Sequence, residues 1–207
     1  MTHEEWIIER SGKVTASIFG AVLRAQNRTT LTAIARKILD AKPEDFDRGG
    51  STDARGWGKA YEDEARSMYA LVTGSDIEPP PIFFLDPHDP LVGCSPDGWD
   101  KTSGHGIEIK CPTNPAVLAR ARYVRTPGPI FELRPDWEAQ VQGSMLVTDA
   151  RRWTLILYDP VASVGDRVVG RLNHWTIERN ERLCARLRKK IDMTTAILAK
   201  LAKETHP

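Results

Sequence analysis

The sequence predicts an α/β fold in which helices flank a central mixed sheet. Two hydrophobic patterns indicate this fold: apolar residues recur at helical spacing in residues 57–72 and 178–203, and short apolar segments between turn residues lie between them. The chain has 207 residues, of which 41% are hydrophobic and 28% are charged. This length and composition fit one globular domain over residues 1–207 with a full hydrophobic core.

Six segments are predicted to be helical. They are residues 4–9, a helix that begins near residue 18, and residues 30–41, 57–72, 136–147 and 178–203. Trp6 and Ile7 are the apolar residues of the first helix, and the longer segments repeat apolar residues every three or four positions. Thr15 or Ser17 is expected to cap the second helix and Asp136 the fifth, because short polar side chains accept hydrogen bonds at helix starts.

Five strands are predicted from short apolar segments bounded by turn residues. They are residues 82–85, 91–95, 106–111, 153–158 and 168–177. The first three are expected to form an antiparallel meander, because Asp, Gly and Pro turns join them. Pro112 ends the third strand, since proline cannot continue a central ladder. Residues 42–53, which contain a Gly-Gly pair, and the Pro-Gly-Pro at 127–129 are expected to be loops.

The third predicted strand carries an acid and a lysine separated by one residue. Side chains alternate along a strand, so Ile107 and Ile109 point to one face and Glu108 and Lys110 to the other, about 7 Å apart. Asp97, which follows the preceding strand, can join Glu108 around a cation that relieves their repulsion. Carboxylate ligands suit Mg²⁺ or Mn²⁺ rather than zinc. By spacing alone, a surface ion pair of Glu108 with Lys110 is the more probable alternative.

Two more polar residues have both a functional and a structural interpretation. Glu62 lies at the edge of the apolar stripe of residues 57–72, where it either reaches a site under the helix or pairs on the surface with Lys59 or Arg66. Gln140 lies on the apolar face of residues 136–147. Its amide either holds a water or a phosphate oxygen, or makes ordinary buried hydrogen bonds.

The net charge of +1 does not by itself indicate a nucleic-acid partner, so DNA binding would require local clusters of positive charge. The candidate clusters are Arg10, Lys13, Arg24, Arg28, Arg36 and Lys37 near the start, and Arg120, Arg122, Arg125 and Arg134 in the middle. Each cluster is otherwise a solvated face. Ser17, at a predicted helix start with an arginine nearby, can hold a phosphate or simply cap the helix.

Cysteine, histidine and hydropathy patterns bear on the compartment. Cys94, Cys111 and Cys184 form no C-x-x-C pair and no even disulfide set, so they are expected to be buried thiols in a reducing compartment. The five histidines show no zinc-ligand spacing. No apolar segment is long enough to span a membrane and the N-terminus lacks a signal-peptide pattern, which favours the cytoplasm.

Three motifs in this order resemble a known nuclease family. They are Ser95-Pro96-Asp97-Gly98, Glu108-Ile109-Lys110-Cys111-Pro112 and Ala139-Gln140-Val141-Gln142. The sequence from about Trp6 to Trp175 resembles the phage-type recombination exonucleases, the lambda exonuclease and YqaJ-like family of the PD-(D/E)XK nuclease superfamily. The order and spacing of the three motifs carry this resemblance, since an Asp and a Glu-x-Lys alone would be a weak signal.

The resemblance implies a restriction-endonuclease-like core and a role for each site residue. Asp97, Glu108 and the main-chain carbonyl of Ile109 would hold Mg²⁺, for which Mn²⁺ would substitute, and Lys110 would position the attacking water. Glu62, through the segment Gly58-Lys59-Ala60-Tyr61-Glu62, would complete the metal environment directly or through water. Gln140 would contribute to the same site. The 5′-phosphate of DNA would be held by Arg10, Ser17 and Ser95.

The resemblance also implies substrate and partners. The expected activity is 5′-to-3′ digestion of one strand of linear double-stranded DNA, which leaves 3′ single strands for recombination by annealing. Relatives form ring-shaped trimers and work with a single-strand annealing protein, in the host cytoplasm when phage-encoded. Two alternatives remain. The first is a superfamily nuclease of other polarity or an endonuclease, Cas4-like or RecB-like; such nucleases often carry an iron–sulfur cysteine set, which the three cysteines here do not form. The second is a non-catalytic DNA-binding module.

Overall fold

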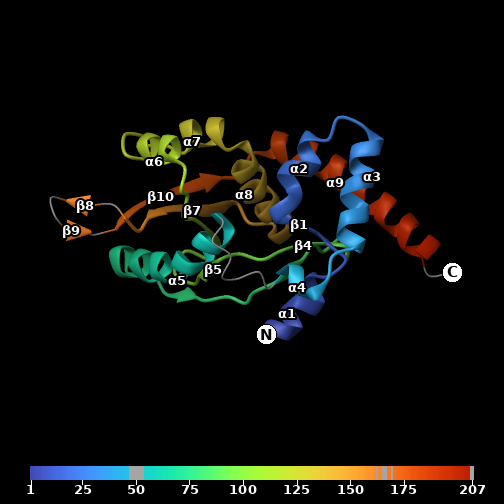
Figure 1. Ribbon diagram of the computed structural model, residues 1–207, viewed down its shortest axis with the longest axis horizontal. Helices are drawn as coiled ribbons and strands as arrows, with labels where there is room; N and C mark the ends of the chain where they lie inside the picture. Colours follow the sequence, from blue (N-terminus) through green and yellow to red (C-terminus); the bar gives the residue numbers. More distant parts are fainter. Residues whose placement is uncertain (47–53, 162, 165–166, 169, 206–207) are drawn as a thin grey trace.

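The computed structural model describes residues 1–46, 54–161, 163–164, 167–168 and 170–205 (Figure 1). The helices are α1 (His3–Arg10), the 3-10 helix η1 (Ala16–Ile18), α2 (Phe19–Arg24), α3 (Arg28–Leu39), α4 (Pro43–Phe46), α5 (Ala54–Thr73), α6 (Pro115–Ala121), α7 (Gly128–Leu133), α8 (Pro135–Thr148) and α9 (Glu181–Thr205). The strands are β1 (Val14–Thr15), β2 (Ile77–Glu78), β3 (Phe84–Leu85), β4 (Val92–Cys94), β5 (Gly98–Asp100), β6 (His105–Lys110), β7 (Arg152–Asp159), β8 (Ser163–Val164), β9 (Arg167–Val168) and β10 (Arg171–Glu178).

The central sheet has five strands in the order β10-β7-β6-β5-β2. β6 and β7 run parallel, and the other neighbouring pairs are antiparallel. The parallel pair is joined through α6, α7 and α8, as parallel strands require a long crossover connection. The predicted mixed α/β fold is therefore confirmed.

The predicted antiparallel meander is correct for its first two strands and wrong for the third. β3 and β4 pair with each other and β4 with β1 in a separate three-stranded sheet, whereas β6 pairs with β5 and β7. The chain leaves the smaller sheet after Cys94 and enters the central sheet at Gly98. Asp97 therefore lies in the connection between the two sheets, directly before β5, the strand that pairs with β6.

Helices cover both faces of the central sheet (Figure 1). On one face, Ala65 and Tyr69 of α5 pack on Ile107 and Ile109 of β6 and on Ile156 of β7. On the other face, helices α6, α7 and α8 pack on the alternate residues of β7 and β10, which are Trp153, Leu155, Leu157, Trp175 and Ile177. The alternation of side chains along each strand thus separates two layers of core.

Helix α2 approaches α8 closely because glycines line the contact. A methyl group at Gly143 of α8 would overlap the ring of Phe19, which is fully buried. A methyl group at Gly20 of α2 would overlap the Cα and Cβ of Asp136 at the start of α8. This contact fixes α8, and hence Gln140, relative to the N-terminal helices.

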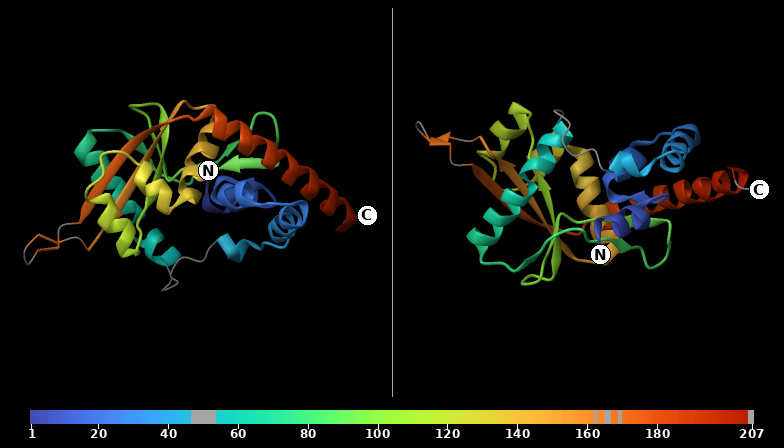
Figure 2. Two further views of the ribbon diagram at one scale, coloured as in Figure 1. Left: turned by 90° about the horizontal axis from the view of Figure 1, so that it is seen from above. Right: turned by 60° about the horizontal axis from the view of Figure 1, so that its bottom comes forward.

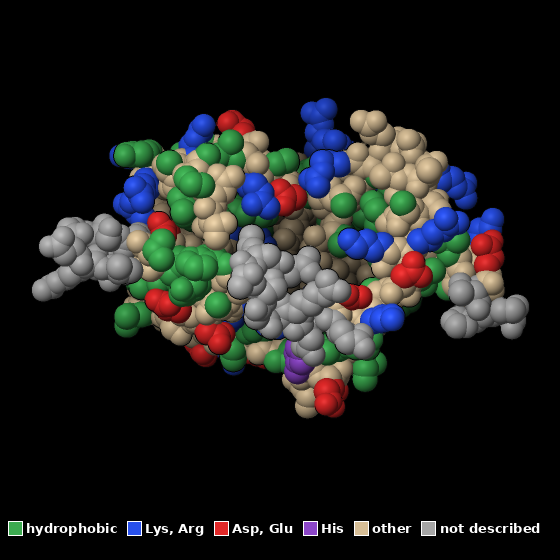
Figure 3. Space-filling view, viewed as in Figure 1, with side chains coloured by type: hydrophobic (Ala, Val, Ile, Leu, Met, Phe, Trp, Pro, Cys, Tyr) green, Lys and Arg blue, Asp and Glu red, His purple; other side chains and the backbone are tan. Residues whose placement is uncertain are grey.

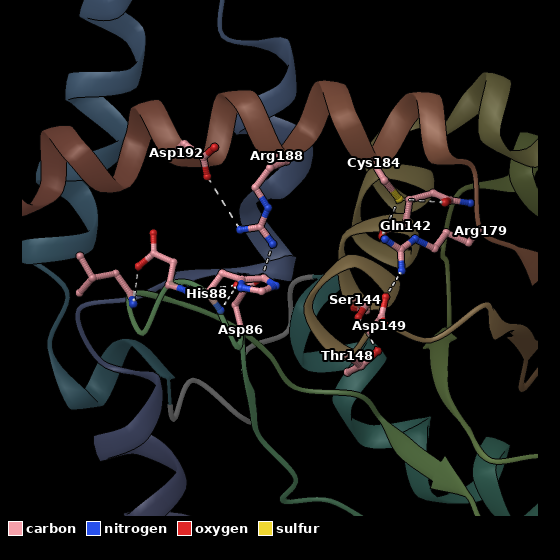
Figure 4. Close-up of polar contacts among 12 residues, drawn as sticks. Asp86, His88, Gln142, Ser144, Thr148, Asp149, Arg179, Cys184, Arg188 and Asp192 are labelled. Carbon is pink, nitrogen blue, oxygen red and sulfur yellow. Dashed lines mark hydrogen bonds and ion pairs between the residues drawn. The ribbon is translucent and has the colours of Figure 1, made fainter.

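Helix α9 is anchored at two points (Figure 4). Arg188 pairs with Asp86, whose side chain is fully buried and also accepts hydrogen bonds from the amides of the loop after β3. Gln142 of α8 accepts from the Asn180 amide at 2.7 Å and donates to the Glu178 carbonyl at 3.0 Å. Beyond these anchors α9 extends away from the sheet toward the C-terminus (Figure 2).

Three predicted helix caps are wrong. Thr15 makes no side-chain capping bond to η1, Ser17 lies inside η1, and the N-cap of α8 is Arg134 rather than Asp136. Asp136 instead accepts two hydrogen bonds from the Arg134 guanidinium. In each case the side chain of the expected cap bonds to another side chain rather than to an amide at the start of the helix.

Several predicted segment boundaries also differ from the structure. The predicted loop at 42–53 contains α4, and its residues 47–53 lie outside the described residues. Pro127-Gly128-Pro129 begins α7, because proline in the first turn of a helix loses no hydrogen bond. The predicted strand at 168–177 is divided between β9 and β10.

The remaining expectations on burial agree with the structure. All three cysteines are buried and free. Among the helices of the described residues, none has both the length and the apolar character needed to cross a membrane.

Candidate active site

Strand β6 places a charged pair on the face of the sheet that α8 covers. Ile107 and Ile109 are buried under α5, so Glu108 and Lys110 point to the opposite face, as predicted. Glu108 is 1% exposed, and its Oε1 accepts a hydrogen bond of 2.5 Å from Lys110 Nζ. Glu108 is buried and the side chain of Lys110 is only 20% exposed, so the pair is not the surface ion pair that spacing alone favoured.

Gln140 of α8 completes this network. Its Nε2 donates to Glu108 Oε1 at 2.7 Å, and its Oε1 accepts from Lys110 Nζ at 3.1 Å. One amide thus holds both the carboxylate and the ammonium, because it has a donor and an acceptor on the same carbon. Gln140 fixes the orientation of both charged groups.

Asp97 is bound to the edge of β6 that faces β5, just beyond the point where β5 begins. Its amide donates to the Ile107 carbonyl at 3.0 Å, and its Oδ2 accepts from the Ile109 amide at 2.7 Å. The carboxylate therefore stands where the carbonyl of a neighbouring strand would otherwise stand. Since the N–H and C=O of one residue in a strand point to the same edge, the Ile109 carbonyl also faces the Asp97 side of β6.

The carboxylates of Asp97 and Glu108 each keep one oxygen available. Within the described part of the chain, Glu108 Oε2 is buried without a hydrogen-bond partner, and no protein hydrogen bond reaches Asp97 Oδ1. A buried carboxylate oxygen without a partner is destabilising, and a hard cation would satisfy it. These residues therefore fit Mg²⁺ or Mn²⁺.

The protein supplies only part of a coordination shell. No group of three or more His, Cys, Asp or Glu side chains among the described residues is arranged to hold a metal ion by itself. Mg²⁺ is commonly held by one or two carboxylates, while waters and phosphate oxygens fill its other positions. The Ile109 carbonyl is one further oxygen at this edge.

The electrostatics of the site favour a bound cation. Burial, and then repulsion by Asp97, raises the pKa of Glu62 to about 7. Burial, together with repulsion by Asp97 and Glu62, raises the pKa of Glu108 to about 8 in spite of Lys110. Burial lowers the pKa of Lys110, but the carboxylates around it outweigh this and raise it. Glu62 of α5 thus shares the field of the other two acids.

A second polar cluster forms between α1, η1 and the connection after β4. Arg10 Nη2 donates to Ser17 Oγ at 2.9 Å, and Ser17 Oγ lies 3.1 Å from the Thr15 hydroxyl. Ser95 Oγ accepts from Trp6 Nε1 at 2.8 Å, and the Arg10 guanidinium lies over the Trp6 ring at 5.0 Å. The three predicted phosphate-binding residues are therefore joined through Trp6. Ser95 also lies two residues before Asp97 and links this cluster to the carboxylates.

Sequence reasoning missed two residues of the site. Trp6 was assigned only an apolar role, although Arg10 follows at the i+4 spacing that allows stacking within a helix. Arg66 was considered only as a surface partner of Glu62. In the structure it pairs with Asp63 and donates to the Asp97 carbonyl. The sequence feature that could have identified Arg66 as a site residue is its i+4 spacing from Glu62, which places both residues on the same side of the helix.

The surface offers positive charge near a concave region. On the face drawn in Figure 3 the molecule is hollowed near its middle, and Lys and Arg side chains border the hollow along its upper side. The charge is thus distributed unevenly over a chain whose net charge is +1.

Known proteins share this fold. The chain is similar to the alkaline exonuclease LHK-Exo from Laribacter hongkongensis, with a TM-score of 0.71 and 24% identity over 97% of this chain and 93% of that chain. LHK-Exo in complex with dAMP gives a TM-score of 0.70, with the same identity and coverage. A phage-related exonuclease from Haemophilus somnus 129PT gives 0.65, at 14% identity over 93% of this chain and 96% of that chain. The fold is therefore that of phage-type exonucleases.

A family model identifies the chain more closely. The model of the YqaJ-like viral recombinase domain matches residues 5–151, which include every candidate site residue named above. The chain belongs to this family. A search of the curated proteins finds no match.

Proposed function

We propose that the protein is a metal-dependent exonuclease that digests one strand of linear double-stranded DNA from its 5′ end and leaves 3′ single strands for annealing recombination. Membership of a viral recombinase family supports a nuclease role in recombination. The observation that carries the proposal is the pair of carboxylates, Asp97 and Glu108, each with one oxygen held and one available, beside a lysine that Gln140 holds in place.

Each residue of the site has a distinct task in phosphodiester hydrolysis. Asp97 and Glu108, with the Ile109 carbonyl and with Glu62 directly or through water, would hold Mg²⁺. Bound there, the cation would polarise the phosphoryl oxygen and lower the pKa of a bound water. Lys110 orients the attacking water and stabilises negative charge on the phosphate, because its ammonium is fixed before the substrate arrives. Gln140 holds the side chains of Lys110 and Glu108 in fixed positions relative to each other.

The second cluster gives the reaction its direction. Arg10 and Ser17 form a charged and hydroxyl donor pair, and Ser95 connects this pair to Asp97 along the chain. A terminal 5′-phosphate bound by these residues would place the first phosphodiester bond of that strand at the carboxylates. Guanidinium and hydroxyl donors are the groups that bind phosphate most effectively.

The named relatives support the substrate and product classes. LHK-Exo is described as an alkaline exonuclease and has been crystallised with dAMP, a deoxynucleotide of the kind that stepwise digestion of DNA would release. From the resemblance of its motifs to the phage-type recombination exonucleases, we propose a homo-oligomer in the form of a ring trimer and a single-strand annealing protein as partner. Double-stranded DNA ends are the proposed substrate.

Digestion of end-labelled duplex DNA tests the activity, its metal requirement and its polarity together. A linear duplex labelled at the 5′ end of one strand should release label as mononucleotide with Mg²⁺ and release none with EDTA. The same duplex labelled at the 3′ end should lose label only late. Early release from the 3′ end would indicate the opposite polarity, internal cuts an endonuclease, and DNA binding without release a non-catalytic module.

Two matched variants separate the site from the rest of the protein. Glu108→Gln should lower the rate of label release by at least about 10²-fold, the effect of losing one charge contact in a transition state, with DNA binding retained. Glu178→Gln makes the same chemical change in an exposed ion pair with Arg152 and should leave the rate unchanged. Full activity of Glu108→Gln with Mg²⁺ would refute the mechanism.

A further inference from the structure

Arg66 is a buried arginine that reaches the backbone of Asp97. Arg66 is 7% exposed. Its Nε donates a hydrogen bond of 2.7 Å to the main-chain carbonyl of Asp97, and its Nη1 pairs with Asp63 at 2.5 Å. The side chain of Asp63 is 92% exposed, so the counter-ion of Arg66 lies at the surface. The interior contact of the guanidinium is with the Asp97 carbonyl.

One donor of this guanidinium is left vacant. In Arg134, Nε and Nη2 both donate to the carboxylate of Asp136, which shows that these two nitrogens form one edge of the group. In Arg66 the Nε of that edge bonds to Asp97, while Nη2 is buried and has no hydrogen-bond partner within the described residues. A buried donor without an acceptor destabilises a fold, so stability alone does not account for Arg66.

The contact adds a tie from helix α5 to the backbone of Asp97. Asp97 lies between β4 and β5, outside both strands. Two of its hydrogen bonds, through its amide and its Oδ2, tie it to β6. The third bond comes from Arg66 on α5, one helical turn after Glu62. Arg66 thus connects Asp97 to the helix that carries the third acid of the site.

Building on the proposed nuclease function, we propose that Arg66 is a positioning residue for the metal site. By holding the Asp97 carbonyl, Arg66 fixes the backbone at Asp97. The available oxygen of Asp97 then lies where it can bind the same cation as the available oxygen of Glu108. The binding of one cation by both acids depends on this alignment of the two oxygens, because partners that orient metal ligands contribute strongly to metal affinity.

Substitutions at Arg66 distinguish positioning from support of the fold. Arg66→Met keeps an unbranched side chain of similar length and removes the charge and the vacant donor. The folded state should persist, because the counter-ion that loses its partner, Asp63, is exposed to solvent. Calorimetric titration with Mn²⁺ should show affinity about tenfold lower or weaker. In the label-release assay kcat should fall while KM for DNA stays unchanged. Arg66→Lys, which retains a donor, should recover part of the Mn²⁺ affinity.

Asp63→Ala is the matched control. Asp63 contacts the other end of the same guanidinium from an exposed position, so its removal should leave Mn²⁺ affinity and kcat unchanged. Unchanged Mn²⁺ affinity in Arg66→Met would overturn the proposal, and so would loss of its folded state, which would assign Arg66 to the support of the fold. If the wild-type protein binds Mn²⁺ but releases no label, the nuclease function fails while the titrations still decide the role of Arg66.

Discussion

Glu108 is buried and in contact with Lys110, which is partly buried, and this contact does not satisfy both oxygens of the Glu108 carboxylate. Lys110 and Gln140 both donate to Oε1 of Glu108, which leaves its Oε2 without a partner in the described residues. Removing a charge from water is costly, and a single ion pair rarely compensates for it. The arrangement therefore lowers the stability of the fold when no cation is bound. A divalent cation is the partner that would satisfy both Glu108 and Asp97.

Mg²⁺ should stabilise the protein more at alkaline than at acidic pH. Without metal, the pKa values of Glu62 and Glu108 are raised from 4.5 to about 7 and about 8, so the fold favours their protonated forms. Stability from these acids is present below pH 4.5 and is lost as pH rises toward 8. Because Mg²⁺ must displace these protons, its affinity rises over the same range.

Thermal unfolding at pH 6 and pH 8.5, each with Mg²⁺ and with EDTA, measures this coupling. The increase in Tm caused by Mg²⁺ should be larger at pH 8.5, where Mg²⁺ at 100 times its Kd would add about 2.7 kcal/mol to the free energy of unfolding. The Glu108→Gln variant should show a smaller increase at both pH values. An increase in Tm that is equal at both pH values would contradict the proposed ligands.

Some residues of the site could be predicted from the sequence and others could not. The strand period placed Glu108 and Lys110 on one face, since that inference needs only local alternation. Arg66 and Trp6 were missed because their partners lie 31 and 89 residues away along the chain. Local periodicity carries no information about contacts of that separation.

The position of Gln140 depends on the contact between helices α2 and α8. Gly143→Ala should destabilise the protein by about 1–3 kcal/mol, the usual effect of overpacking a tight contact. Its added methyl group would overlap the ring of Phe19. Chemical denaturation measures the change in the free energy of unfolding.

Gly58→Ala is the control for Gly143→Ala. Gly58 also lies in a helix, and a methyl group there would have no neighbour within 4 Å. Alanine at Gly58 should stabilise the protein by about 0.5–1 kcal/mol through helix propensity. Equal effects of the two substitutions would mean that the α2–α8 contact is looser than described.

Long elements were predicted well and short ones were not. The helices at α5 and α9 and the strand β7 follow strong periodic patterns, and their bounds differ from the predicted ones by only a few residues. β2 and β5 have two and three residues, too few for a period to appear. The assignment of β4 to another sheet was also beyond local patterns, because pairing depends on contacts across the chain.

At the scale of the whole molecule, digestion should depend on the phosphate at the 5′ end of DNA. Arg10, Ser17 and Ser95 come from separate segments and meet through Trp6. Wild-type protein should digest 5′-phosphorylated duplex faster than dephosphorylated duplex. Ser17→Ala should reduce that ratio by about tenfold, because a hydrogen bond to a charged group contributes about 1.5–3 kcal/mol. Initial rates on the two substrates give the ratio.

Ser103→Ala serves as the control for this prediction. Ser103 lies in the turn between β5 and β6, outside both the phosphate cluster and the carboxylates, and its substitution should leave the ratio as in the wild type. Equal rates of the wild-type protein on phosphorylated and dephosphorylated ends would reject the phosphate site, although the carboxylate site could still hydrolyse DNA.

Anomalous diffraction from crystals soaked in Mn²⁺ tests the central claim most directly. We expect a Mn²⁺ peak bonded to Asp97 Oδ1 and Glu108 Oε2, about 2.0–2.6 Å from each oxygen as for other hard cations. The peak should be absent from crystals of Glu108→Gln. Fully occupied Mn²⁺ elsewhere in the wild-type crystals, with none between these two carboxylates, would contradict it.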